Sequence, residues 1–230
     1  MTAWSDHLFA DVAQRLEALA DPERAGPMAA YLRDQYPLLG VASADRKRQL
    51  REAMRETTQE HGRPIGADVE AFARRCYDQA EREYHYVGVG LARSQQKLLG
   101  PEHVDLLHHL VVTHSWWDTV DELAAHVAGG IVSRHREVAE VMDQWVESDD
   151  MWVARTAILH QLRFKGDTDV DRLFRYCLLR AGEADFFYRK AIGWALRQYA
   201  RTDPDAVRRF CADHADELSP LSLREATKHL

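Results

Sequence analysis

The sequence has few of the features that mark secreted, membrane-bound or disulfide-stabilised proteins. Its 230 residues include three cysteines, Cys76, Cys177 and Cys211, and none of them lies in a C-x-x-C pair. This scatter suggests neither a disulfide framework nor a zinc knuckle, and it fits a reducing compartment. No apolar run approaches the roughly 20 residues of a membrane-spanning helix, and the N-terminus has no signal-peptide pattern. We therefore expect a cytoplasmic protein without a membrane partner.

Motifs for several common catalytic chemistries are also missing. The chain has no glycine-rich phosphate loop, no H-E-x-x-H and no G-x-S-x-G. The cysteines have no identifiable activating neighbour. Four histidines lie close together in the sequence, but their spacing fits no metal template: His103, His108, His109 and His114. We therefore expect no metal, no other cofactor and no nucleophilic triad.

Charge is distributed unevenly along the chain. The net charge of −7, taken alone, argues against nucleic acid as a partner. Residues 101–150 carry 11 acidic and 2 basic side chains, whereas residues 151–200 carry 9 basic and 5 acidic ones. We therefore expect a local basic surface despite the acidic total, because local potential is what attracts phosphate groups.

Helical periodicity dominates the sequence, and the alternation typical of β-strands is scarce. We therefore expect an all-α protein. A helix that starts at Ser115 and Trp116 is expected to end around Gly129 and Gly130. The other helices are expected at about 5–20, 25–35, 44–61, 67–79, 82–98, 102–112, 136–147, 150–164, 169–181, 185–201, 204–215 and 222–230, the last two with start signals at Asp203-Pro204 and Ser222-x-x-Glu225.

Short helices joined by tight turns, without a long linker, favour paired helices stacked side by side. Trp117, Trp152 and Trp194 lie 35 and 42 residues apart, near the spacing of HEAT-like repeats. Residues 1–230 are therefore predicted to form one HEAT-like α-solenoid domain, whose concave face is built from one helix of each antiparallel pair. A compact helical bundle is the alternative.

The stretch S-W-W-D-T-V-D, which begins at Ser115, is predicted to start a helix. Ser115 and Asp118 have the spacing of a capping box, which makes Trp116 the first helical residue. Trp116 then faces the core, whereas Trp117 shares a stripe with Asp121, four residues further on. An indole beside a carboxylate suggests a cation site. The alternative is that the tryptophans only pack and that Asp121 is a solvated acid.

Two later helices place basic residues among apolar ones. Arg155 lies between apolar positions, either as an arginine that snorkels out of a packed helix or as a phosphate clamp. Lys190, Trp194 and Arg197 share one face of the helix at 185–201, and an aromatic ring among cations is rarely core. Gly193 costs about 1 kcal/mol relative to alanine inside a helix. Close approach of a ligand such as a backbone phosphate is one use for that cost.

Taken together, these motifs resemble those of the AlkD family of DNA alkylation repair glycosylases. The matching segments are S-W-W-D-T-V-D at 115–121, W-x-x-R-x-A-I-L-x-Q-L at 152–162, K-A-I-G-W at 190–194 and L-S-x-R-E-A-x-K-H at 221–229. Shorter matches at 27–28, 31–32 and 39–41 extend the resemblance over almost the whole chain.

The resemblance implies a HEAT-like solenoid that holds duplex DNA and hydrolyses the N-glycosidic bond of N3- or N7-alkylated purines without a metal. It assigns the catalytic carboxylate to Asp121, the two sugar-facing indoles to Trp117 and Trp194, and a phosphate contact to Arg155. Further DNA contacts are expected from basic residues of the same region: Lys165, Arg189, Lys190, Arg197 and Lys228. Two features depart from the family pattern: Ala154 stands where a second basic residue is common, and the chain is acidic overall.

Three further expectations follow. The family can act without flipping the base, and the sequence shows no enclosed aromatic cage, so bulky adducts should be tolerated. The enzyme is expected to act as a monomer, and Asp121→Asn is expected to leave folding almost unchanged. Two alternatives stay open: a self-resistance glycosylase specialised for bulky alkyl-purine adducts, and a non-catalytic helical-repeat scaffold that binds DNA or protein.

Overall fold

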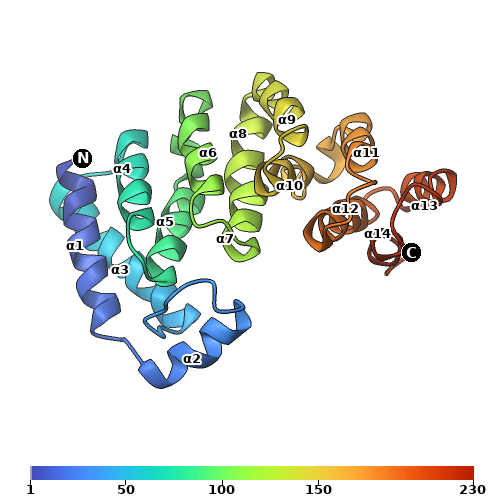
Figure 1. The fold of residues 1–230 in the computed structure, drawn as a ribbon. Coiled ribbons are helices and arrows are strands. Elements are labelled where there is room, and N and C mark those ends of the chain that lie inside the picture. The colour runs from blue at the N-terminus through green and yellow to red at the C-terminus, as the bar shows by residue number, and fades with distance from the viewer. Residues whose placement is uncertain (1) are drawn as a thin grey trace. The chain divides into compact units, whose positions relative to one another are not determined.

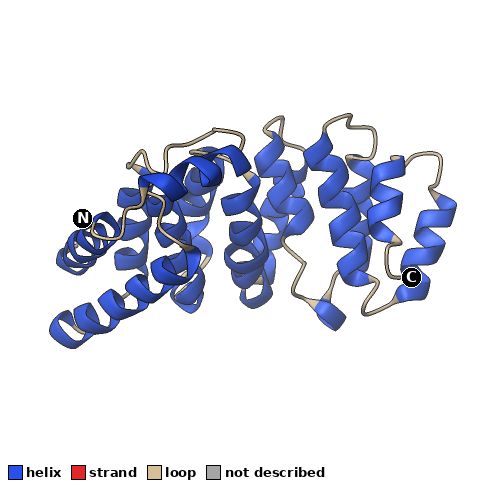
Figure 2. Cartoon of the chain, turned by 90° about the horizontal axis from the view of Figure 1, so that it is seen from below, coloured by secondary structure: helices blue, strands red, loops and turns tan. Residues whose placement is uncertain are grey.

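The computed structural model describes residues 2–230, and every regular element among them is helical (Figure 2). No β-strand occurs in this range, which confirms the all-α prediction. None of these helices combines the length and the apolar character that a membrane crossing requires. Backbone packing divides the chain into two compact units, Met1–His114 and Ser115–Leu230. The prediction of a single domain over the whole chain stays a prediction.

The first unit contains α1 to α6, with two short 3₁₀ turns between the last two helices (Figure 1). Leu8, Val12 and Leu16 recur every fourth residue and are fully buried, which gives α1 one apolar face against α3 and α4. The Trp4 indole donates a hydrogen bond to the carbonyl of Gly62 over 3.1 Å and fastens the start of α1 to the end of α3. The helices are α1 (Ala3–Glu17), α2 (Pro22–Tyr31), α3 (Ser43–His61), α4 (Gly66–Tyr77), α5 (Arg82–Ser94) and α6 (Val104–Val112).

The second unit contains α7 to α14, and it carries all the residues predicted to form a site. Its core is made of aliphatic residues such as Leu159, Ile192 and Leu196, which are at most 2% exposed. α10 packs against α9 and α12, and α12 packs closely against α14. The helices are α7 (Trp117–Glu122), α8 (Gly129–Arg134), α9 (Ala139–Val146), α10 (Met151–Leu159), α11 (Val170–Leu179), α12 (Phe186–Tyr199), α13 (Pro204–Asp213) and α14 (Pro220–Ala226).

The helix predicted near Ser115 differs from the prediction at both ends. α7 begins at Trp117, and Trp116 is an extended N-cap residue without a side-chain capping bond, so the predicted capping box is wrong. The chain then widens into a π-helical stretch, Leu123–Ala128, and continues as α8 through both glycines to Arg134. A Cβ at Gly129 would lie 2.3 Å from the carbonyl oxygen of His160. The glycine therefore permits close helix packing instead of ending the helix.

Two predicted helix starts near the C-terminus had different outcomes. Asp203 caps α13 as predicted, because its carboxylate accepts a hydrogen bond of 2.8 Å from the N–H of Ala206. The start predicted at Ser222 is wrong, since α14 begins at Pro220 and Ser219 is its capping residue. Ser222 and Glu225 therefore lie inside α14, where their side chains are directed to other partners.

Gly193 is explained by helix packing and not by the predicted approach of a ligand. A Cβ at this position would meet the Cβ of Glu225 at 2.4 Å and the carbonyl oxygen of Ser222 at 3.0 Å. The glycine thus lets α12 approach α14 closely, and the Ser222 hydroxyl donates across the same contact to the carbonyl of Arg189 over 3.0 Å. The backbone at Gly193, which was predicted to be accessible to a phosphate, is covered by α14.

Candidate active site

An ion pair between Asp121 on α7 and Arg155 on α10 forms the centre of the candidate site. The guanidinium donates two parallel hydrogen bonds, Nε to Oδ1 over 2.7 Å and a terminal nitrogen to Oδ2 over 2.8 Å. Such bidentate geometry fixes the orientation of a carboxylate as well as its position. The two partners differ in exposure, with 21% of the Asp121 side chain accessible and only 1% of the Arg155 side chain. Solvent therefore reaches Asp121 but hardly reaches Arg155.

Arg155 lies between apolar positions of α10, as the sequence predicted, but its guanidinium is directed into the protein. Its third nitrogen donates to the backbone carbonyl of Phe187, at the start of α12, so all three guanidinium nitrogens are used inside the protein. These hydrogen bonds use three of the five N–H groups, and only 1% of the side chain is accessible, so the guanidinium presents almost no surface to a ligand. This geometry argues against the predicted contact with a DNA phosphate and makes Arg155 the link between α7, α10 and α12.

Burial raises the pKa of the Asp121 carboxyl above its ordinary value, while the charge and the hydrogen bonds of Arg155 act in the opposite direction. Asp118 and Glu122, which lie on the same helix, add to the rise. Desolvation disfavours the charged form of an acid, and here it outweighs the effect of the cation. The ion pair also connects Asp121 to α10, which is a reason to expect that loss of its charge affects folding.

The two predicted sugar-facing indoles are both half-buried. Trp117 opens α7 and lies one helical turn before Asp121, on the same face, as the four-residue spacing predicts. Trp194 on α12 lies near the same ion pair, because the Arg155 guanidinium carbon is 5.3 Å from the centre of its indole. Asp121 and Trp194 thus contact one guanidinium from two different helices. The structure brings the three predicted catalytic residues to one region of the second unit.

The sequence predicted that Trp116 packs in the core among aliphatic residues. In the structure it packs in an aromatic cluster instead. Its ring centre lies 5.7 Å from that of Trp152 and 5.2 Å from that of Phe187, and these two lie 5.0 Å apart. Separations of this size are typical of favourable aromatic pairs. The cluster is half-buried and includes the residue whose carbonyl binds Arg155. The cluster therefore packs around Phe187, whose backbone carbonyl holds the Arg155 guanidinium.

The remaining predicted DNA contacts fall into two groups. Lys190 and Arg197 are both bound to Glu225, over 2.8 Å and 2.9 Å. Lys165 and Lys228 are exposed, and Arg189 is half-buried with its Nε donating to the carbonyl of Glu183. Lys165 and Lys228 therefore present their charge to solvent without rearrangement.

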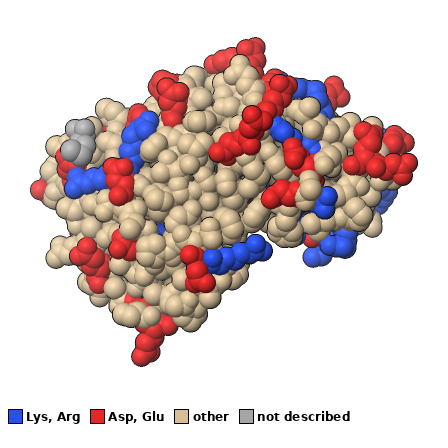
Figure 3. Space-filling view, in the orientation of Figure 1, with Lys and Arg blue, Asp and Glu red and all other residues tan. Residues whose placement is uncertain are grey.

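Ion pairs reduce the basic surface that was predicted for residues 151–200. Six of the nine basic side chains in this block pair with an acid: Arg155, Arg172, Arg175, Arg180, Lys190 and Arg197. On the face shown in Figure 3, basic and acidic side chains are intermixed and much of the surface is uncharged. The local positive potential is thus weaker than the count of basic residues suggests.

Glu225 is the functional candidate that the sequence did not identify. It was interpreted as part of a helix start, because it follows Ser222 by three residues. In the structure it is 35 residues from Lys190 in sequence and reaches it from a neighbouring helix. A glutamate in the segment L-S-x-R-E-A-x-K-H was the available signal, but only the packing of α14 on α12 shows its partners.

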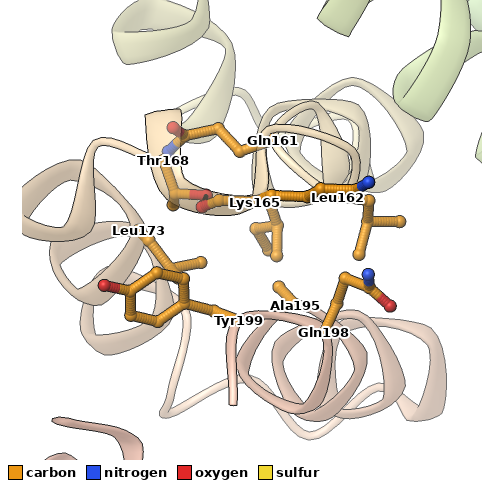
Figure 4. A pocket seen from close by; sticks show the side chains of 9 residues that line it. Gln161, Leu162, Lys165, Thr168, Leu173, Ala195, Gln198 and Tyr199 are labelled. Carbon is orange, nitrogen blue, oxygen red and sulfur yellow. Dashed lines mark hydrogen bonds between the residues drawn. The ribbon is translucent and has the colours of Figure 1, made fainter. Parts of the chain in front are cut away.

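A small cleft lies between the end of α10, α11 and α12 (Figure 4). Its volume is about 10 Å³, which is room for one water molecule at most. Its lining includes Lys165, Gln198 and Tyr199 but none of the three predicted catalytic residues. This cleft is too small to receive an extruded base.

One group of potential metal ligands occurs among residues 2–230. His7, Glu60 and His61 place their ligand atoms within 4.8 Å of one another, and all three side chains are exposed. They belong to α1 and α3 of the first unit, and none of them was proposed for the site. The chemistry of the candidate active site, a carboxylate with indoles and a buried guanidinium, offers no comparable set of metal ligands.

Comparisons with known proteins agree with this fold. A solved structure described as a predicted DNA alkylation repair enzyme from Enterococcus faecalis is 29% identical, with a TM-score of 0.83 over 92% of this chain and 96% of that one. The structure of AlkD2 from Streptococcus mutans shares the helical-repeat fold at 14% identity, with a TM-score of 0.60 over 90% of this chain and 99% of that one. No curated protein sequence matches. The sequence profile of the DNA alkylation repair enzyme family matches residues 12–230, and the chain belongs to that family.

Proposed function

We propose that this protein is a DNA glycosylase that hydrolyses the N-glycosidic bond of N3- or N7-alkylated purines in duplex DNA. The observation that carries the proposal is the partly exposed Asp121 carboxylate, held by the buried Arg155 near two half-buried indoles. A carboxylate that is fixed in this way and still partly open to solvent is suited to face a developing cation. Family membership supports action on alkylated DNA.

The chemistry needs little acid catalysis. An alkylated purine is already cationic, so the bond from C1′ to the base nitrogen can break with its electron pair passing to the base, which leaves neutral. Positive charge then develops on the sugar, as in other glycoside cleavages. Water adds to C1′ and gives up a proton, for which the Asp121 carboxylate is the acceptor. The residues therefore have to supply negative charge at C1′ and a place for the water.

Asp121 and the indoles fit these requirements. A preorganised carboxylate stabilises a developing cation most effectively where water is partly excluded. The faces of Trp117 and Trp194 add about 0.5 to 2 kcal/mol each as cation–π contacts. Arg155 orients the carboxylate, and because Arg155 is buried whereas Asp121 is partly exposed, an approaching sugar meets the acid first. Arg155 is thus a positioning residue and not a phosphate clamp.

DNA binding is proposed to rest on phosphate contacts from the same unit. Lys165 and Lys228 are exposed and available, and Arg189 lies close to the surface of α12. Lys190 and Arg197 can contribute once a phosphate competes with Glu225 for them. Because so many basic residues are paired, we expect modest affinity for undamaged duplex DNA.

The excision rate is expected to fall at acid pH, and to fall earlier than an ordinary aspartate would cause. The pKa of Asp121 is raised, so the carboxylate becomes protonated and loses its charge at a higher pH as the solution is acidified. The measurement is the single-turnover excision rate between about pH 4 and pH 8, corrected for loss of base without enzyme. A profile that stays flat at the acid end, or an acid limb that persists in Asp121→Asn, would contradict the assignment.

The function itself is tested with a panel of duplexes that each carry one defined adduct: N3-methyladenine, N7-methylguanine and a bulky N3 or N7 adduct. The protein should release the damaged base and leave an abasic site that alkali cleaves. Because the sequence shows no enclosed aromatic cage for an extruded base, tolerance of the bulky adduct is expected. Binding to these duplexes without release of any base would overturn the glycosylase and favour the scaffold.

A further inference from the structure

Glu225 binds both cations that flank Trp194. Its carboxylate accepts hydrogen bonds from the Nζ of Lys190 over 2.8 Å and from a terminal nitrogen of Arg197 over 2.9 Å. The indole of Trp194 is a third donor, and these partners, with Lys190 first, lower the pKa of the Glu225 carboxyl. Only 15% of the Glu225 side chain is exposed. The glutamate is therefore ionised and shared among three neighbours at ordinary pH.

The fold fixes this arrangement rather tightly. Gly193 brings the backbone of α12 against α14, where the Cβ of Glu225 occupies the space a side chain would take. Ser222, one turn earlier on α14, donates to the carbonyl of Arg189 and holds the two helices in register. Two contacts between α12 and α14, at Gly193 and at Ser222, thus direct Glu225 to the face of α12 that carries Trp194.

The charges around Trp194 show what Glu225 does. The Nζ of Lys190 lies 5.0 Å from the centre of the indole and the guanidinium carbon of Arg155 lies 5.3 Å from it. Asp121 balances Arg155, and Glu225 balances Lys190 and, in part, Arg197. Without Glu225, two cations next to Trp194 would lack a paired acid. Their charge would then oppose any positive charge placed on the same indole.

We propose that Glu225 is a positioning residue that restrains Lys190 and Arg197. It keeps their charge from opposing the cationic sugar beside Trp194, and it does so at the expense of their contacts with DNA phosphates. The proposal rests on the proposed glycosylase function for its catalytic half. Its binding half depends only on a duplex and on the two freed cations.

The test is Glu225→Gln, which keeps the shape of the side chain and an acceptor for the indole but removes the charge. Lesion-free duplex should bind more tightly, and the slope of log affinity against log salt should steepen by about 0.9 for each cation that gains a phosphate. Single-turnover excision should slow by about tenfold, because the freed cations oppose the developing charge. A merely structural role would weaken binding and excision together, and that result would overturn the proposal.

Two further variants complete the test. Asp205→Asn removes an acid from an exposed pair with Arg208 on α13, and it should change neither the excision rate nor the salt slope. Lys190→Gln combined with Glu225→Gln removes one freed cation and should restore part of the rate. If wild-type protein excises no lesion, the glycosylase proposal fails, and the restraint by Glu225 is then decided by binding alone. Unchanged affinity and salt slope in Glu225→Gln would overturn it.

Discussion

Asp121→Asn is expected to slow base excision by about 10²- to 10³-fold, the usual effect of removing one preorganised electrostatic group. Asparagine keeps the shape and volume of the side chain but carries no charge to face the developing cation on the sugar. The rate is measured with enzyme in excess over DNA, because single-turnover kinetics separate the chemical step from product release. Intrinsically labile N7 adducts should keep more residual activity than stable lesions, since they need less help.

The matched control for this result is Glu122→Gln, which removes a neighbouring acid from the same helix. Glu122 is 43% exposed and lies near His126, so its charge is better screened by solvent. It should leave the excision rate within a few-fold of wild type. If Asp121→Asn excises every alkylpurine at the wild-type rate, Asp121 is not catalytic and α7 serves only in packing.

Folding has to be monitored in the same experiment. Asp121→Asn leaves the charge of Arg155 without its acid, and a side chain that is 1% exposed cannot be hydrated in place. From the sequence alone, Asp121→Asn was expected to leave folding almost unchanged. Because its partner Arg155 is buried, we expect instead that the variant has a lower free energy of unfolding than the wild type. Circular dichroism at the assay temperature shows whether the slow protein is still folded.

Arg155→Met is expected to lower the free energy of unfolding by about 3 kcal/mol, the lower end for breaking a buried ion pair. The loss leaves Asp121 without its bidentate partner and the Phe187 carbonyl without its donor. The lower end applies because 21% of the Asp121 side chain can be solvated. Urea unfolding followed by circular dichroism measures the change.

Two comparisons make this expectation specific. Arg208→Met breaks an exposed pair with Asp205 and should cost no more than about 1 kcal/mol. Arg155→Met combined with Asp121→Asn removes both charges and should be more stable than Arg155→Met alone. Equal losses for Arg155→Met and Arg208→Met would show that the buried pair does not hold α7, α10 and α12 together.

Local rules were sufficient to place some of these residues. Trp117 and Asp121 share a face because the helix is regular between them, and the four-residue spacing predicts it. Asp203 caps α13 because an acid before a proline is a local start signal. The all-helical class followed from hydrophobic periodicity, which depends on neighbours within a few residues.

Other features depended on contacts between distant segments. Arg155 was correctly placed between apolar positions, but its burial against Asp121 and Phe187 comes from three helices meeting. Gly193 was interpreted as a site of close approach by a ligand, whereas the approaching group is Glu225 on α14, which the sequence of α12 alone does not identify. Periodicity specifies which face of a helix is apolar, and it does not specify which helix covers that face.

The most direct test of the central claim is the deuterium kinetic isotope effect at C1′ of the damaged nucleotide, measured in single turnovers. If Asp121 and the indoles stabilise a cationic sugar, C1′ becomes nearly planar before water adds. The substrate with ordinary hydrogen at C1′ should then react measurably faster than the substrate with deuterium at C1′. An isotope effect at or below unity would mean that water bonds to C1′ while the base leaves, as in a concerted displacement, and it would contradict the account.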